Sequence, residues 1–227
     1  MRPVLTHPWN LAPRDAFALQ RTLASRVRAA GRAPRAPFLV AGCDATGSGR
    51  WARRDEELIA GVIVFRYPGW EIVDSAWARA PAPFPYVPGL LSFREIPVYL
   101  EALAGLRTRP AILLCDGQGI AHPRGLGLAA HLGVLLDLPS IGVAKSRLIG
   151  THREPGRARG CSVRLLHEGR AIGRVVRTQT GVKPLFVSPG HRIGIAEAAA
   201  LVVRLAPRYR LPEPTRRAHQ WVGSLRG

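Results

Sequence analysis

Hydrophobic and polar positions along the chain predict alternating strands and helices, with a strand–helix–strand unit near the middle. An apolar run over 111–115 ends at Asp116, a helix-like segment covers 125–136, and a second apolar run over 139–144 ends at Lys145. Two short apolar runs joined by a helix are typical of parallel strands buried on both faces. We therefore expect Asp116 and Lys145 at the carboxyl ends of parallel strands, the edge at which α/β sheets bind ligands.

The segment before this unit predicts one helix and three strands. Apolar residues at four-residue spacing favour a helix over 12–30. The predicted strands cover 38–44, 57–67 and 71–78, with a turn over 46–50. Pro68 and Gly69 separate the last two strands, which predicts an antiparallel meander.

A proline-rich loop over 80–90 precedes a helix predicted over 91–106. Four prolines restrict this loop to an extended course that presents Phe84 and Tyr86. Tyr86 on such a stiff loop suits a wedge, because an enzyme that flips a base out of the stack must fill the gap. A loop aromatic that packs on the core is the alternative.

Beyond residue 150 the pattern predicts a hairpin, a further strand and two helices. These are hairpin strands over 162–166 and 171–177, a strand over 185–187, a helix over 195–205 and a last helix after Thr215. Together the elements predict an α/β fold, in which a mixed sheet has an antiparallel meander followed by parallel strands and is flanked by helices. We expect a single domain over 1–227.

The net charge of the chain indicates a class of partner, because 33 basic against 15 acidic residues give a net charge of +18. Such an excess indicates a polyanionic partner, with nucleic acid as the first choice. A solvated basic surface in an arginine-rich proteome is the alternative. Only Lys145 and Lys183 are lysines, so each is a candidate for a role that a planar guanidinium does not fill.

The compartment is predicted from three features that the sequence does not show: a membrane-spanning run, a signal peptide and paired cysteines. No apolar run approaches about 18 residues, and the N-terminus has no charged segment followed by an apolar core. Three cysteines without a paired spacing argue against a disulfide framework or a structural zinc site. We therefore expect a cytoplasmic protein with no membrane partner.

Three acidic residues share a context that suggests metal binding. Asp44 and Asp116 each end a buried strand, and Glu95 lies in the first turn of a predicted helix. Neighbouring carboxylates resist ionisation unless a cation lies between them, and their hard oxygens favour Mg²⁺ or Mn²⁺. Beside a basic surface, such a site suggests phosphodiester hydrolysis. In the alternative, the aspartates cap loops and Glu95 forms a capping box with Ser92.

The cysteines that precede the two aspartates are not expected to join this site. Strand alternation turns Cys43 and Cys115 to the opposite face of the sheet. Both are therefore interpreted as small core residues behind the acids.

Lys145 and several histidines are further candidates. Lys145 would neutralise charge at a phosphate in the transition state, with a surface ion pair as the alternative. His219 on the last helix would bind metal or orient water, with a purely structural role as the alternative. Composition does not rank His122, His131 and His191.

Six strings in the chain resemble those of the endonuclease V family. They are Pro85-Tyr86-Val87-Pro88-Gly89, Leu91 to Pro97, Asp116 to Arg124, His131 to Pro139, Ile141 to Lys145 and Val182 to His191. They follow the family's order, and the resemblance spans roughly residues 38–220. Several strings are long and compositionally uncommon, so the resemblance is specific.

This resemblance implies a ribonuclease H-like fold and a Mg²⁺-dependent endonuclease, with Mn²⁺ as a substitute. The family cleaves DNA at deoxyinosine, at the second phosphodiester bond on the 3′ side of the lesion, and some members act on inosine in RNA. We therefore expect a monomeric DNA repair enzyme whose partner is DNA containing deoxyinosine.

The family's functional residues map onto matching positions of this chain. By resemblance, the metal-binding acids are Asp44, Glu95 and Asp116, the active-site lysine is Lys145, and the C-terminal histidine is His219. The strand-separating tyrosine is Tyr86, flanked by Pro85, Val87 and Pro88. The pocket for the flipped hypoxanthine would consist mostly of backbone and apolar groups around Gly89, Leu91, Gly117, Gly119, Leu128, Gly142 and Leu148.

Some positions depart from the family pattern, and two rival functions stay open. Gln118 stands where many members carry histidine, so no catalysis is assigned there. Cys43 to Thr46 is an unusual form of the first-strand motif, although Asp44 is present. The rivals are an inosine-directed endoribonuclease and a non-catalytic nucleic-acid-binding protein.

Overall fold

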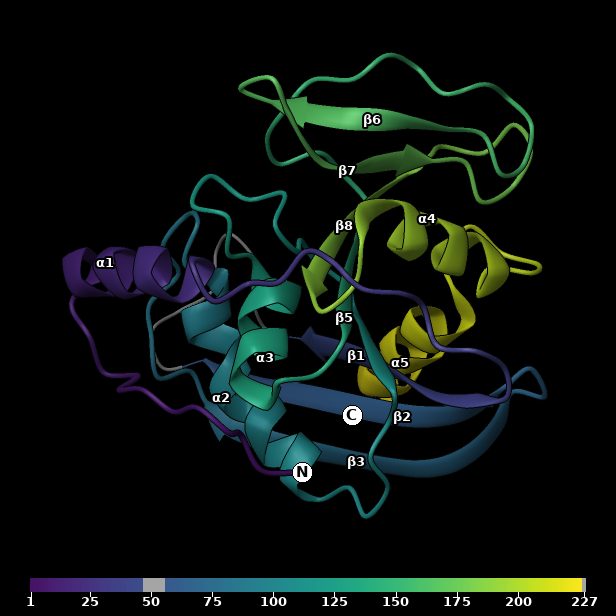
Figure 1. The fold of residues 1–227 in the computed structure, drawn as a ribbon. Helices are drawn as coiled ribbons and strands as arrows, with labels where there is room; N and C mark the ends of the chain where they lie inside the picture. Colours follow the sequence, from purple (N-terminus) through teal and green to yellow (C-terminus); the bar gives the residue numbers. More distant parts are fainter. Residues whose placement is uncertain (47–55, 226–227) are drawn as a thin grey trace.

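The residues that the computed structural model describes, 1–46 and 56–225, form an eight-stranded mixed sheet flanked by helices (Figure 1). The strand order is β3-β2-β1-β4-β5-β8-β7-β6. The strands are β1 (Phe38–Thr46), β2 (Glu57–Tyr67), β3 (Glu71–Pro81), β4 (Ile112–Cys115), β5 (Ser140–Ala144), β6 (Ser162–His167), β7 (Arg170–Val176) and β8 (Leu185–His191). The helices are α1 (Pro13–Ala24), α2 (Leu91–Ala104), α3 (Leu128–Leu136), α4 (Ile195–Arg204) and α5 (Glu213–Ser224).

The pairing of the strands confirms the predicted mixed sheet. β1, β2 and β3 form an antiparallel meander, whereas β1, β4 and β5 pair in parallel. β8 returns antiparallel to β5, and β7 and β6 extend the sheet as a hairpin. Cys43 lies opposite Cys115, so the residues that follow them leave β1 and β4 at the same edge. From residue 47 onward, the turn predicted over 46–50 lies outside the described residues.

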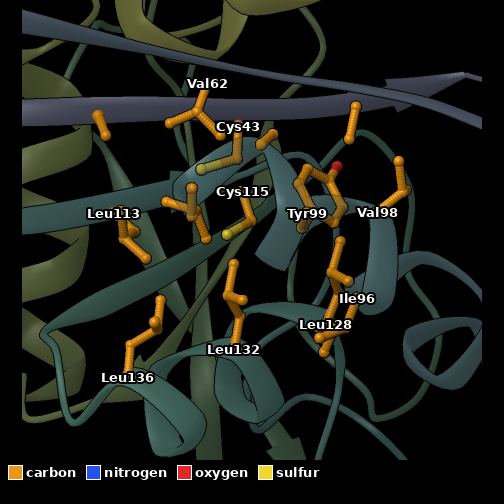
Figure 2. Close-up of a cluster of buried hydrophobic side chains, with 14 of the residues drawn as sticks. Cys43, Val62, Ile96, Val98, Tyr99, Leu113, Cys115, Leu128, Leu132 and Leu136 are labelled. Carbon is orange, nitrogen blue, oxygen red and sulfur yellow. The ribbon is translucent and has the colours of Figure 1, made fainter. Parts of the chain in front are cut away.

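Helices cover both faces of the sheet (Figure 1). α2 and α3 pack against β1, β2 and β4 on one face, and α4 and α5 cover the other. Figure 2 shows Cys43 and Cys115 within the first of these layers, near Tyr99, Leu113 and Leu132. Both cysteine side chains are fully buried, which confirms the prediction that they belong to the core.

The first helix is shorter than its pattern predicted. α1 ends at Ala24, although apolar spacing favoured a helix to residue 30. Beyond it, the amide of Arg28 donates to Nδ1 of His191 at 3.3 Å, and the carbonyl of Gly31 accepts from the amide of Gly194 at 2.9 Å. These contacts satisfy backbone groups that a longer helix would otherwise bond internally.

The last helix lies unusually close to the strands beneath it. A Cβ atom at Gly42 of β1 would lie 2.0 Å from the carbonyl oxygen of Pro214, and one at Gly61 of β2 would lie 2.5 Å from Cγ2 of Val222. Glycine at both positions therefore permits the approach of α5. The contact brings His219, in the middle of α5, over the end of β1.

Candidate active site

The edge where β1 and β4 end gathers three candidate metal ligands. Asp44 lies near the end of β1, Asp116 follows β4, and His219 comes from α5. Ligand atoms of these residues all lie within 4.8 Å of one another. Parallel pairing of β1 and β4 thus brings together the two aspartates that the sequence pattern singled out, and the packing of α5 adds the histidine.

A hydrogen bond fixes the orientation of His219. Its Nδ1 lies 2.9 Å from Oδ2 of Asp44. The Asp44 side chain is almost fully buried, whereas that of His219 is half exposed. A ring held through Nδ1 leaves Nε2 as the second nitrogen available for a water or a phosphate oxygen.

The electrostatics of Asp44 suit a cation site. Burial raises the pKa of this carboxyl, and the neighbouring carboxylate of Asp116 raises it further, to about 6. His219 and Lys145 act in the opposite direction without cancelling the effect. A divalent cation between the two aspartates would relieve both the burial cost and the repulsion. Carboxylate oxygens are the ligands that Mg²⁺ and Mn²⁺ prefer, so the donor set fits the expected metal.

Lys145 lies at the same edge, immediately after β5. Its Nζ is 2.5 Å from Oδ2 of Asp116, and both side chains are partly exposed. The ammonium group therefore faces the site and remains accessible to a negatively charged ligand. The ion pair that sequence reasoning offered as an alternative is present, but its partner is a candidate metal ligand.

Arg210 supports this edge and was not predicted. Its Nη2 donates to the carbonyl of Lys145 at 3.0 Å, and its Nε donates to the carbonyl of Lys183 at 2.8 Å. It also lies close enough to Asp116 for that carboxylate to raise its pKa, against a larger lowering by burial. With so many arginines in the chain, no pattern distinguished this one.

Glu95 lies beside the three-residue group but does not belong to it. It is buried on α2. Burial raises the pKa of the Tyr99 phenol well above its usual value, and the carboxylates of Glu95 and then Asp44 raise it further. Among the described residues, the group of ligand atoms within 4.8 Å contains Asp44, Asp116 and His219 only.

The capping box considered for Glu95 is not formed. α2 begins at Leu91 with Leu90 at its N-cap, so Ser92 is already inside the helix. The Ser92 hydroxyl lies 3.0 Å from Nδ1 of His131 on α3. The interpretation of Glu95 as the partner of a capping serine is therefore wrong.

A cavity of about 150 Å³ lies beside these acids, between the proline-rich loop, α2 and α3. Five residues predicted for the base pocket line it, namely Gly89, Leu91, Gly117, Leu128 and Leu148, together with Tyr86, the predicted wedge. Ser92, Gln118, His122, Leu126 and Gly127 also line it and were not predicted for this role. The cavity adjoins Asp116 through Gly117, so a base inside it would hold its backbone near the acids.

The other residues predicted for recognition lie behind or beside the cavity. A Cβ atom at Gly142 would lie 2.3 Å from the amide nitrogen of Gly119, so these two glycines pack tightly beneath the turn that carries Gly117. Pro85, Val87 and Pro88 belong to the loop that carries Tyr86 but do not line the cavity.

The proline-rich loop presents only one of its two aromatic residues. Phe84 is buried against Phe93 in a core cluster, contrary to the expectation that the loop exposes it. Tyr86 is half-buried and lines the cavity. The loop thus buries the Phe84 ring in the core and leaves Tyr86 partly exposed in the lining of the cavity.

Two residues far apart in sequence hold the loop in place. Nη2 of Arg124 donates to the carbonyl of Gly89 at 2.9 Å. Nε2 of Gln20 on α1 lies within hydrogen-bonding distance of the carbonyls of Gly89 and Leu126, at 3.1 and 2.8 Å. Arg124 and Gln20 also bond each other. Gln20 is fully buried, and as a polar residue on an amphipathic helix it gave no sequence signal.

The three histidines that composition did not rank lie in different parts of the structure. His122 lines the cavity, and burial followed by the nearby charge of Arg124 lowers its pKa to about 4, so the ring is neutral. His131 is fully buried in α3. His191 ends β8, which is antiparallel to β5, and therefore lies at the edge of the sheet opposite Lys145.

Known proteins match this fold and its sequence over nearly the whole chain. The family model for endonuclease V matches residues 21–220. The chain belongs to the endonuclease V family. Endonuclease V of Thermus thermophilus is 51% identical over 226 residues, which cover 98% of this chain and 97% of the relative.

Solved structures of the family share the fold. Endonuclease V of Streptomyces avermitilis has 41% sequence identity and a TM-score of 0.90, over 99% of this chain and 97% of its own. Endonuclease V of Ciona intestinalis, solved with a 24mer DNA containing an inosine followed by a ribo-adenosine, has 26% identity and a TM-score of 0.78, over 93% and 96%. The family is one of nucleases, so the prediction of an enzyme is confirmed, and the rival of a non-catalytic binding protein loses support. Within the described residues, no helix is long and apolar enough to span a membrane.

Proposed function

We propose that this protein is a metal-dependent endonuclease that recognises deoxyinosine in DNA and nicks the second phosphodiester bond on the 3′ side of the lesion. The observation that carries the proposal is the juxtaposition of two close aspartates, of which Asp44 is buried, with a base-sized cavity. The Ciona relative crystallised with inosine-containing DNA supports the substrate class. We further propose that residues 1–227 act as one monomeric domain in the cytoplasm.

Asp44, Asp116 and His219 would hold the divalent cation, which we take to be Mg²⁺, with Mn²⁺ as a substitute. The cation, when bound, would supply polarisation of the scissile phosphate and an activated water. Their donor atoms lie within 4.8 Å of one another, and repulsion between the two carboxylates favours a cation between them. Glu95, which is buried on α2 and acts together with Asp44 on the Tyr99 phenol, stays a proposed third acid that would bind the cation or orient its water.

Lys145 and His219 would act on the phosphate and the water. The Lys145 ammonium is partly exposed beside Asp116, where it would neutralise the charge that develops on the phosphate oxygens. His219 is oriented through Nδ1 by Asp44, which leaves its Nε2 to bind the cation directly or to hold a water beside it. Arg210 bonds the backbone of Lys145 and would keep the lysine at this edge.

The flipped hypoxanthine would occupy the cavity beside Asp116. Leu91 and Leu128 supply apolar walls, while Gly89 and Gly117 allow the backbone to approach the edge of the base. Tyr86, which lines the cavity and is partly exposed, would fill the space that the base leaves in the stack. Arg124 and Gln20 hold the Gly89 loop in position for both contacts.

A nicking assay with four end-labelled substrates tests this proposal. The substrates are a duplex with one deoxyinosine, its undamaged counterpart, and RNA with and without inosine. We expect one metal-dependent cut in the deoxyinosine duplex, lost in chelator, and no cut in undamaged DNA. Asp116→Asn should abolish cleavage and spare binding. Absence of cleavage of the deoxyinosine duplex in the presence of Mg²⁺ or Mn²⁺ would overturn the proposal.

Cleavage of inosine in RNA is the second candidate. The Ciona relative was crystallised with a ribo-adenosine immediately after the inosine, which brings a ribose to the position beside the lesion in that complex. If the RNA substrate is cut faster than the DNA duplex at equal concentration, the endoribonuclease replaces the DNA repair enzyme as the main activity.

A further inference from the structure

Ser92 lines the cavity beside the acids, and the proposed function gives it no role. It is almost fully buried in the first turn of α2. Its hydroxyl is one end of a chain of hydrogen bonds that runs away from the cavity into the N-terminal segment. The polarity of this chain determines what the Ser92 oxygen offers to a ligand.

The chain contains two histidines and a backbone carbonyl. Oγ of Ser92 lies 3.0 Å from Nδ1 of His131, and Nε2 of His131 lies 2.8 Å from Nε2 of His7. At the far end, Nδ1 of His7 lies 2.8 Å from the carbonyl oxygen of Pro8. A histidine nitrogen or a serine hydroxyl can either donate or accept a hydrogen bond. The position of each proton therefore has to be assigned from the whole network.

The carbonyl at the far end decides the direction of every proton. A carbonyl oxygen only accepts, so Nδ1 of His7 carries a proton, and Nε2 of a neutral His7 is an acceptor. Nε2 of His131 must then donate to it, which leaves Nδ1 of His131 as an acceptor. The Ser92 hydroxyl therefore donates to His131, and its proton is not available to a ligand in the cavity.

The surroundings keep both rings neutral and in place. His131 is fully buried, and burial lowers the pKa of His131 strongly and that of His7 as well. The His7 ring lies 4.1 Å from Trp9, and the His131 ring lies 5.1 Å from Phe93, centroid to centroid. Apolar surroundings of this kind strengthen a polar network in which every hydrogen bond is formed. They also make the opposite arrangement of donors and acceptors costly, because it would leave a buried group unpaired.

We propose that Ser92 is a specificity-determining residue, whose oxygen accepts a hydrogen bond from the N1–H of the flipped hypoxanthine. Its proton is committed to His131, so the hydroxyl presents lone pairs only. Hypoxanthine carries a proton on N1, whereas N1 of adenine or of unsubstituted purine is an acceptor and would face these lone pairs unpaired. His131 and His7 are positioning residues that hold this polarity.

This inference rests on the proposed function, so its test separates the two. Nicking of the deoxyinosine duplex by the wild-type protein tests the function. Equilibrium binding in chelator tests Ser92, with otherwise identical duplexes that carry deoxyinosine or deoxynebularine, the nucleoside of unsubstituted purine. Both bases lack exocyclic amino groups, and any contact to O6 is unchanged between protein variants. The ratio of the two affinities therefore isolates the contribution of Ser92.

We expect the wild-type protein to prefer deoxyinosine and Ser92→Ala to lose about tenfold in affinity for deoxyinosine, because the N1–H is left unpaired in a buried site. Binding of deoxynebularine should change less than about twofold, since it forms no such bond. The preference should thus fall about tenfold. A merely structural role for Ser92 would weaken binding of both duplexes equally.

Two further variants complete the design. Ser140→Ala removes another buried hydroxyl, one that donates to the carbonyl of Ala129 at 2.7 Å, and should leave the ratio unchanged. His7→Phe keeps a ring against Trp9 but frees the proton of His131 to move to Nδ1, which turns the Ser92 hydroxyl toward the cavity. It should shift the ratio toward deoxynebularine, although His7 is not among the residues that line the cavity.

The outcomes are distinct. Loss of preference in Ser92→Ala and His7→Phe, with Ser140→Ala unchanged, supports the inference. Equal affinity of the wild-type protein for both duplexes, or an unchanged ratio in Ser92→Ala, overturns it while the proposed function stands. Failure of the wild-type protein to nick the deoxyinosine duplex overturns the proposed function, and the inference falls with it.

Discussion

Asp44 bears the main electrostatic cost of the site. It is buried beside Asp116, and its pKa is raised to about 6 in the metal-free protein. Its position and that of Asp116 could be predicted, because each ends an apolar strand. The raised pKa could not, since it depends on burial and on a neighbour 72 positions away in the chain, which only the folded sheet supplies.

A first prediction concerns pH. A cation binds the ionised form of Asp44, so protons compete with the metal as pH falls below about 6. The apparent affinity for Mn²⁺ should be nearly constant above pH 7 and fall by up to about tenfold for each pH unit below 6. Calorimetric titration of Mn²⁺ from pH 5 to about 8 measures this. A constant affinity across that range would contradict the assignment.

A second prediction concerns stability. Because the folded pKa of Asp44 lies above its usual value of 3.8, ionisation destabilises the metal-free fold, and the stability contributed by the protonated form is lost as pH rises through about 6. Asp44→Asn should therefore raise the free energy of unfolding at pH 8 in chelator, by up to about 3 kcal/mol, while it abolishes cleavage. Denaturant unfolding measures the change.

Asp74 provides the matched control. Its carboxylate accepts from the amides of Arg107 and Thr108 at 2.8 and 2.7 Å, and these bonds outweigh burial and lower its pKa. Asp74→Asn should destabilise the protein at pH 8 and leave metal binding intact. If both substitutions shift stability in the same direction, ionised Asp44 does not destabilise the fold as inferred from its raised pKa.

Other residues at this scale were beyond sequence reasoning. Arg210 and Gln20 act through hydrogen bonds to backbone carbonyls, which any arginine or glutamine can make. The spacing of Ser92 and Glu95 matched a capping box, but the helix begins at Leu91 and the serine bonds His131 instead. Local spacing was overridden by a tertiary partner.

At the scale of elements, the site depends on how α5 lies on the sheet. The helix itself was predicted, but its contact with β1 and β2 was not, because a glycine in a strand does not indicate which element covers it. Gly42 contacts the backbone of Pro214, and His219 follows on the same helix. The distance between α5 and β1 therefore controls the third ligand of the candidate metal site.

A third prediction tests this contact. In Gly42→Ala the new methyl group would lie 2.0 Å from a backbone oxygen, so α5 must move away. We expect destabilisation of about 1–3 kcal/mol from overpacking and a loss of cleavage close to that of His219→Ala. Gly69→Ala is the control, because a Cβ atom there meets nothing within 4 Å. Normal cleavage by Gly42→Ala would show that His219 does not depend on this packing.

At the scale of the whole molecule, the mixed sheet and its order of elements followed from the hydrophobic pattern. Short apolar runs joined by a helix identified the parallel strands, and the break at Pro68 identified the meander. The end of α1 was misjudged because its continuation bonds β8 and α4 instead. Long-range hydrogen bonds of this kind leave no trace in local periodicity.

The net charge of +18 is a property of the whole chain and leads to a fourth prediction. Arginines that contact phosphates displace counterions from the DNA. The logarithm of the affinity for DNA should therefore fall linearly with the logarithm of the salt concentration. About six contacts would lower affinity roughly 10³-fold between about 50 and 200 mM salt. Binding titrations of the deoxyinosine duplex in chelator measure the slope. An affinity insensitive to salt would contradict a phosphate-tracking surface.

We propose above all that the aspartate pair at the ends of β1 and β4 holds the catalytic cation. The most direct measurement is a Mn²⁺ titration of the wild-type protein and of Asp116→Asn, followed by nicking of the deoxyinosine duplex at each metal concentration. We expect metal binding and nicking to rise together in the wild-type protein, and Asp116→Asn to lose both while it still binds the duplex. Wild-type metal binding or nicking by Asp116→Asn would contradict it.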